Sequence, residues 1–129
     1  MLYFDERGVS RRYEASLRGN EWKWWRNDAD FSQVFVRQID LLARAEDAVL
    51  GLSTSGASAN VNRALRRARD RNVLTIGFAG RDGGAMVDLC QFCFVVPSWS
   101  IHRIQETHTT LLHLLWDQVH VALGADDVL

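Results

Sequence analysis

The residues best suited to chemistry in this sequence form a short run of hydroxyl-bearing side chains around one glycine, Ser53–Ser58. Its potential donors are Ser53, Thr54, Ser55 and Ser58. The run follows an apolar segment typical of a buried strand and precedes a segment with helical periodicity. Because a helix N-terminus offers unpaired N–H groups and the positive end of the helix dipole, this junction could hold a phosphate without any lysine. An ordinary serine-capped helix, with Ser58 as the N-cap, explains the same residues equally well.

Three other groups of residues favour structural interpretations. Cys90 and Cys93 form a CxxC motif where a helix ends and a strand begins, whereas a redox motif needs its first cysteine at a helix N-terminus. We therefore expect two buried structural cysteines. The arginines between residues 63 and 71 are expected on the solvated face of one helix, since acidic residues elsewhere balance them. A tryptophan-rich segment at residues 22–25 is expected to cover an exposed edge or a subunit contact.

The bulk composition indicates one domain with a hydrophobic core. The chain has 129 residues, of which 47% are hydrophobic, enough for one core and too little for two. A net charge of −1 shows no basic excess, so no nucleic-acid partner is expected. No apolar run approaches the roughly 20 residues that span a bilayer, so no membrane partner is expected. Two cysteines and no apolar leader at residues 1–8 favour a cytoplasmic location.

From residue 48 onward, apolar runs alternate with helical patterns. The expected strands are Ala48–Leu52, Val73–Phe78 and Phe92–Val96. The expected helices are an amphipathic one carrying Val61, Ala64, Leu65 and Ala68, a short one at Ala85–Leu89, and a long buried one at Ile101–Leu123. Strands and helices that alternate with short connections predict a parallel sheet with right-handed crossovers.

The part of the chain before residue 48 has a weaker pattern. Apolar residues predict one helix over Asp30–Ala43, which Asp28 or Asp30 could cap. Met1–Arg26 mixes arginines with tryptophans and is expected to be irregular or partly helical.

Several motifs, in one order, resemble the phosphoheptose (sedoheptulose 7-phosphate) isomerases of the SIS-domain family. The resemblance runs through Asp47–Val61, Ile76–Gly84, Val96-Pro97 and Arg103–His108 to His113. Upstream, Asn27-Asp28 and the segment that follows it are similar to the family's Asn-Asp segment and its helix. The matched part therefore covers residues 27–123.

This resemblance assigns expected roles to individual residues. The sugar phosphate would be held by Ser53, Thr54, Ser55 and Ser58. His113 matches the catalytic histidine that moves protons between aldose and ketose, Gln105 matches a glutamine lining the same site, and Asp28 matches an active-site aspartate. By its leucine neighbours alone, His113 would more often be a core residue than a catalytic one.

The resemblance also makes Gln105 and His113 tentative zinc ligands, since the matching glutamine binds zinc in some members. Eight residues on a straight helix correspond to a rise of about 12 Å and a rotation of about 80°. A single zinc ion contacting both side chains would need long reaches or an irregular helix start. A bound zinc is therefore less expected than none.

The implied fold is a three-layer αβα sandwich with a parallel sheet, of the SIS and flavodoxin-like type, truncated on its N-terminal side. Residues 1–26 are expected to be a divergent segment and residues 27–129 the sugar-phosphate-binding domain. Without the family's flanking strands, Ala48–Leu52 would be a sheet edge, which together with exposed apolar surface predicts a homo-oligomer, a dimer or a tetramer.

The sequence also departs from the family pattern. The family's Gly-Asn-Gly-Gly-Ser loop, and the His and Glu that follow it, have no match in Met1–Arg26. His102 stands where the family usually has an aspartate, and Ala57 replaces an asparagine of the phosphate loop. The function that the resemblance implies is isomerisation of a seven-carbon sugar phosphate. Turnover needs a base that faces the sugar carbon, and in the family that base is the Glu of the unmatched segment. The alternative is a non-catalytic SIS module that binds a phosphosugar or a protein partner for regulation.

Overall fold

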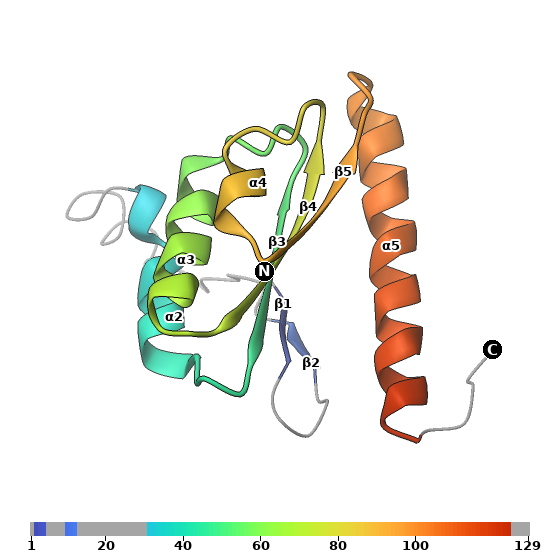
Figure 1. Ribbon diagram of the computed structural model, residues 1–129. Coiled ribbons are helices and arrows are strands. Elements are labelled where there is room, and N and C mark those ends of the chain that lie inside the picture. The colour runs from blue at the N-terminus through green and yellow to red at the C-terminus, as the bar shows by residue number, and fades with distance from the viewer. Residues whose placement is uncertain (1, 5–9, 13–30, 125–129) are drawn as a thin grey trace, which may run out of the picture.

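The computed structural model describes residues 2–4, 10–12 and 31–124 of the chain. A five-stranded sheet separates two layers of helices (Figure 1). Helices α2 (Val36–Leu42), α3 (Ala59–Asp70) and α4 (Met86–Leu89) cover one face, and α5 (Ile101–Ala122) covers the other. The predicted αβα sandwich is therefore confirmed.

The centre of the sheet is parallel, as predicted. Strand β4 (Leu74–Gly80) lies between β3 (Ala48–Ser53) and β5 (Phe92–Val96) and pairs with both in parallel. Because the strands run in parallel, β3 and β4 end at the same edge, where Ser53 is paired with Ala79.

Two short antiparallel strands extend the sheet beyond β3. Strand β1 (Leu2–Phe4) pairs with β3, and β2 (Ser10–Arg12) pairs with β1, which gives the order β2-β1-β3-β4-β5. The expectation of irregular or partly helical chain over residues 1–26 did not include these strands. They occupy the edge of β3 that we expected to be bare, whereas the tryptophan-rich segment lies outside the described residues.

The single helix predicted over Asp30–Ala43 was wrong. The chain instead forms a 3₁₀ turn, η1 (Phe31–Gln33), and then α2, which begins after Phe35. Phe35 has no polar side chain to cap the helix, and it packs against the core together with Ile39. Both proposed capping aspartates, Asp28 and Asp30, lie outside the described residues.

The main core lies between the sheet and α3. Its members are Ile39, Ala43, Val49, Ala64, Leu65, Ala68, Val73, Ala79, Met86 and Leu89. Gly51 permits this packing, because a Cβ at that position would lie 2.8 Å from Cδ1 of Leu65. The amphipathic helix predicted from Val61, Ala64, Leu65 and Ala68 is thus confirmed as α3.

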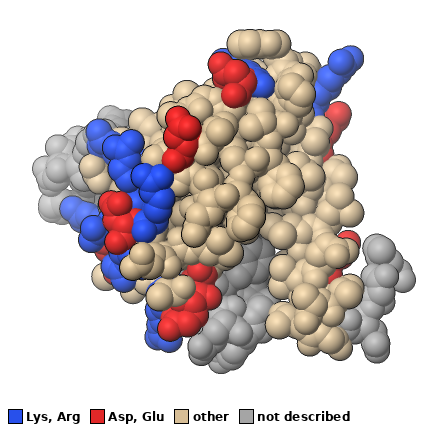
Figure 2. Space-filling model, in the orientation of Figure 1, with Lys and Arg blue, Asp and Glu red and all other residues tan. Residues whose placement is uncertain are grey.

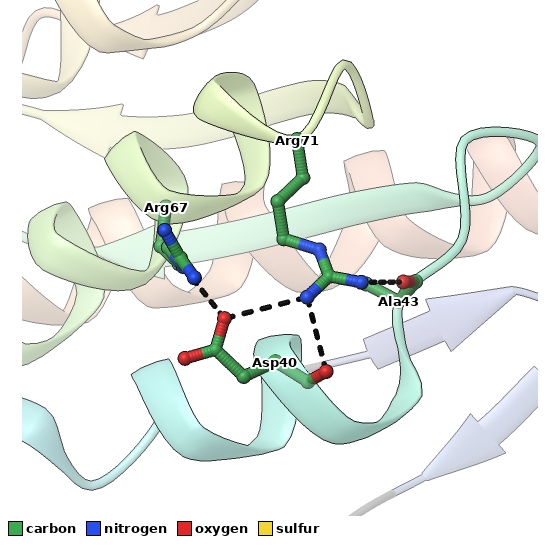
Figure 3. Close-up of polar contacts among 4 residues, drawn as sticks. All are labelled: Asp40, Ala43, Arg67 and Arg71. Atoms are coloured by element: carbon green, nitrogen blue, oxygen red, sulfur yellow. Dashed lines mark hydrogen bonds and ion pairs between the residues drawn. The ribbon is translucent and has the colours of Figure 1, made fainter.

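The arginines of α3 are largely exposed, as predicted, but several also join neighbouring elements. Positive side chains gather over α2 and α3 at the left of Figure 2. Arg67 Nε lies 2.6 Å from Oδ1 of Asp40 (Figure 3). The guanidinium of Arg71 donates to the carbonyl oxygens of Asp40 at 3.0 Å and Ala43 at 2.9 Å. Arg69 donates to the carbonyl of Asp88, so these arginines hold α2 and α4 against α3.

Helix α5 was predicted to be buried, and this prediction was wrong. Its buried residues are Ile104 and His108. Its large exposed apolar residues are Ile101, Leu114, Trp116 and Val121. Only one narrow side of the helix packs on the sheet. The helix therefore has more apolar residues than its contact with the sheet within one chain buries. None of the described helices is long and apolar enough to cross a membrane.

Candidate functional site

The hydroxyl-rich loop lies where β3 ends and α3 begins. Ser58 is the N-cap of α3, but its side chain does not cap the helix. Its hydroxyl instead lies 2.8 Å from the hydroxyl of Ser53, while Ser55 Oγ accepts the N–H of Ala57 at 3.2 Å. The structure therefore does not support Ser58 as an ordinary side-chain cap. The hydroxyls bond within the loop, at the carboxyl end of a parallel strand, where open α/β sheets bind ligands.

A second loop supports the first. Gly56 has a φ of +63°, and a Cβ there would lie 1.9 Å from the carbonyl oxygen of Gly83. The Gly56 carbonyl accepts two hydrogen bonds, from the N–H of Met86 at 3.1 Å and from Nδ2 of Asn62 at 3.0 Å. Neither Asn62 nor the contact of Gly83 with Gly56 was predicted from the sequence. The glycine pair at residues 83–84 was the available signal, because it permits such a close backbone approach.

The loop faces an open depression of about 260 Å³ that α5 borders on its other side. Its lining residues are Leu52, Ser53, Thr54, Gln105, His108 and Thr109. The structure thus brings Gln105 together with Ser53 and Thr54, although they are far apart in the sequence. Ser53 is 5% exposed, whereas Gln105 is exposed on the helix surface. The depression thus combines two hydroxyl-bearing side chains with the amide of Gln105 on one concave surface.

His108 also borders this depression, and the sequence analysis did not select it. The imidazole is 4% exposed, and its Nε2 lies 3.1 Å from the carbonyl oxygen of Ala79. A carbonyl oxygen only accepts hydrogen bonds, so Nε2 carries the proton in this contact. The sequence signal that could have identified His108 is its position one helical turn after Gln105, which places both residues on neighbouring parts of the helix surface.

His113, the predicted proton-transfer residue, is exposed on α5 and does not line the depression. Gln105, Thr109 and His113 follow one another at intervals of four, so they form a row along one side of the helix. We call these three residues the α5 row. Its far end lies about 12 Å along the helix axis from its near end. Asp28, the third predicted catalytic residue, lies outside the described residues.

The described part of the chain offers no evident zinc site. Within residues 2–4, 10–12 and 31–124, no three His, Cys, Asp or Glu side chains gather where they could hold a metal ion. Gln105 and His113 lie eight residues apart on the regular helix α5, and their assignment as zinc ligands stays a prediction. We therefore derive no chemical step through a metal.

The two cysteines have protonated, half-buried thiols. Burial, with a smaller contribution from Cys93, raises the pKa of Cys90 from 9.0 to about 12 despite the opposing charge of Arg69. Burial also raises the pKa of Cys93. Both residues pack against the core, and a Cβ on Gly77 would lie 2.8 Å from Sγ of Cys90. These environments favour the predicted structural role over a redox role.

Comparison with curated proteins places the chain beside phosphoheptose isomerases. It is 50% identical over 99 residues to the phosphoheptose isomerase of Pelobacter propionicus, and the matched region covers 77% of this chain and 52% of that protein. It is 47% identical over 97 residues to the enzyme of Geobacter metallireducens, covering 75% of this chain and 51% of the relative. The chain therefore spans about half the length of the curated relatives that it matches. No protein-family model matches the chain.

Solved structures give the same result. The phosphoheptose isomerase of Neisseria gonorrhoeae matches with a TM-score of 0.71 and 38% identity, over 75% of this chain and 55% of that one. The phosphoheptose isomerase of Francisella tularensis matches with a TM-score of 0.70 and 33% identity, over 75% of this chain and 54% of that one. Over the part that it shares with them, the chain is a homologue of the phosphoheptose isomerases.

Proposed function

We propose that this chain is a sugar-phosphate isomerase of the phosphoheptose type, acting between sedoheptulose 7-phosphate and the corresponding aldose. The observation that carries the proposal is the hydroxyl loop at the end of β3, which faces Gln105 across one depression. The names of the curated and structural relatives support the same reaction. Two hydroxyl-bearing residues, Ser53 and Thr54, line the depression without a carboxylate side chain in its lining, and α3 begins directly after the loop, which suits a dianionic phosphate.

In this proposal, the phosphate rests on Ser53, Thr54, Ser55 and Ser58. The α5 row then runs alongside the carbon chain of the sugar, with Gln105 nearest the phosphate. In a seven-carbon sugar phosphate, the phosphate and the reacting carbons lie at opposite ends. The distance of His113 from the loop is therefore compatible with a role as proton shuttle at the carbonyl end.

We further infer that the chain works as a homo-oligomer in the cytoplasm. The exposed apolar residues of α5 are the supporting observation, with Leu114 53% and Val121 50% exposed. A second copy packed on this side would bury them and would also enclose the exposed His113. Two free thiols with raised pKa values are compatible with a reducing compartment.

Light scattering of the purified chain and of Leu114→Glu tests the assembly. A charge at Leu114 should shift the mass toward the monomer, because it would be buried in the contact. Leu41→Glu is the matched control, since Leu41 is 83% exposed on α2, in the opposite helix layer. A monomeric wild-type chain, or equal effects of both substitutions, would contradict the oligomer.

Calorimetric titration with sedoheptulose 7-phosphate, followed by an isomerase assay, tests the function. Ser55→Ala should weaken binding several-fold, because it removes one hydroxyl donor from the phosphate. Binding with turnover supports the isomerase. Binding without turnover selects the non-catalytic sugar-phosphate module instead, which the unmatched base-bearing segment of the family favours. An absence of binding at millimolar sugar phosphate would refute both.

A further inference from the structure

Helix α5 is seated on the sheet by two buried side chains, Ile104 and His108. The rest of its described surface is largely exposed or half-buried. Ile104 and His108 are therefore the most deeply buried anchors of the helix among the described residues. Of the two anchors, His108 is the one that makes a directional contact, the hydrogen bond from Nε2 to Ala79 O at 3.1 Å.

This hydrogen bond ends beside the phosphate loop. Ala79 is paired with Ser53 across the β3–β4 ladder, so the accepting carbonyl belongs to the neighbour of the first loop hydroxyl. The next residue, Gly80, brings the three elements into contact. A Cβ on Gly80 would lie 2.5 Å from the carbonyl oxygen of Thr54 and 2.6 Å from Cδ1 of Ile104. The end of β4, the loop and α5 therefore meet at one junction.

The aromatic surroundings hold the imidazole at this junction. Its ring lies 6.0 Å from the ring of Phe78, with an angle of 46° between the planes. Phe78 is fully buried and in turn makes an edge-to-face contact with Phe94, at 5.6 Å between centroids. Phe94 is 50% exposed, so the buried aromatic neighbour that packs near the imidazole is Phe78.

We propose that His108 is a positioning residue for the sugar-phosphate site. Its Nε2–H, donated to Ala79, sets the spacing between the phosphate loop and the α5 row. Gln105 lies three residues before His108 and Thr109 one residue after it, and both line the depression with Ser53 and Thr54. A rotation of α5 about its axis would move the whole row relative to a bound phosphate. This inference rests on the proposed function.

Two substitutions separate the hydrogen bond from the volume of the side chain. His108→Gln keeps an amide N–H donor at about the reach of Nε2, whereas His108→Leu fills similar space without a donor. Calorimetry with the full chain should measure affinity for inorganic phosphate and for sedoheptulose 7-phosphate. We expect His108→Leu to keep phosphate affinity within about twofold, because the loop hydroxyls are unchanged, and to lose about tenfold for the sugar phosphate, because the α5 row loses the hydrogen bond that fixes its spacing from the loop. His108→Gln should recover most of that loss.

Equal losses for both ligands, an unchanged sugar-phosphate affinity in His108→Leu, or a failure of His108→Gln to recover it would each overturn the positioning role. Failure of the proposed function looks different, since the wild-type chain would then bind neither ligand. In that case two ligand-free measurements decide about His108. Long-range ¹H–¹⁵N spectra should show the proton on Nε2, and amide exchange in the first half of α5 should rise in His108→Leu but not in His108→Gln. An Nδ1–H tautomer or unchanged exchange would refute the inference.

Discussion

Substitution of Gly56 by alanine should disable the phosphate loop while leaving every hydroxyl in place. The φ of +63° at Gly56 is a left-handed conformation, which costs a residue with a Cβ about 1–2 kcal/mol. In addition, the new Cβ would lie 1.9 Å from the carbonyl oxygen and 2.4 Å from the carbonyl carbon of Gly83. These are backbone atoms, so they cannot move aside as a flexible side chain would.

Relief of this overlap requires the two loops to separate, which lowers the free energy of unfolding by a further amount of about 1–3 kcal/mol. The separation would also weaken the hydrogen bonds that the Gly56 carbonyl accepts from Met86 and Asn62. We therefore expect Gly56→Ala to lower the free energy of unfolding by about 3–5 kcal/mol in total. Urea denaturation followed by circular dichroism measures this quantity, and calorimetry with inorganic phosphate measures the loss of binding.

Gly124→Ala is the matched control, because it isolates the cost of the backbone conformation. Gly124 has a φ of +76°, and nothing lies within 4 Å of a Cβ built there. Its substitution should cost only the conformational part, about 1–2 kcal/mol. If Gly56→Ala is no less stable than Gly124→Ala and still binds phosphate as the wild type does, the contact between the two loops does not shape the site.

Three further predictions follow from the described contacts. Asp40→Asn should lower the free energy of unfolding by about 0.5–1 kcal/mol in urea denaturation, because it weakens two partly exposed arginine contacts, while Asp70→Asn should change it little. The free energy of unfolding should fall as pH rises above 9, because the pKa of Cys90 is 9.0 in the unfolded chain and about 12 in the fold, so the unfolded chain loses its proton first. Cys90→Ala should flatten this dependence in denaturation curves at about pH 8–10.5. Asn62→Asp should weaken phosphate binding at least tenfold in calorimetry, since it removes a donor to the Gly56 carbonyl and adds negative charge beside the loop.

The elements that could be predicted from the sequence are those whose signal is local. Strands β3 and β5 lie within a residue of their expected bounds, and α3 contains the four apolar residues that predicted it. An apolar run or an amphipathic period is itself the reason why each element is buried. The hydroxyl loop was recognisable for the same reason, since its strand, glycine and helix are contiguous.

The wrong predictions concern features that depend on partners distant in the sequence. The segment predicted as one helix over residues 30–43 is interrupted by a turn at Val34 and Phe35, and Phe35 packs against a core that later elements complete. The apolar pattern of α5 predicted burial, but a pattern cannot tell whether the covering surface belongs to the same chain. Strands β1 and β2 are too short to carry a detectable alternation.

The sequence by itself determined that strands β3, β4 and β5 are parallel and what chemical character the loop has, because both follow from the local pattern of residues. Only the tertiary structure decided which residues of α5 meet that loop. It selected Gln105 and His108 for the depression and left His113 on the exposed surface. The rotation of a helix on a sheet is set by the few side chains that it buries, and contacts such as His108 with Ala79 join residues that no local pattern connects.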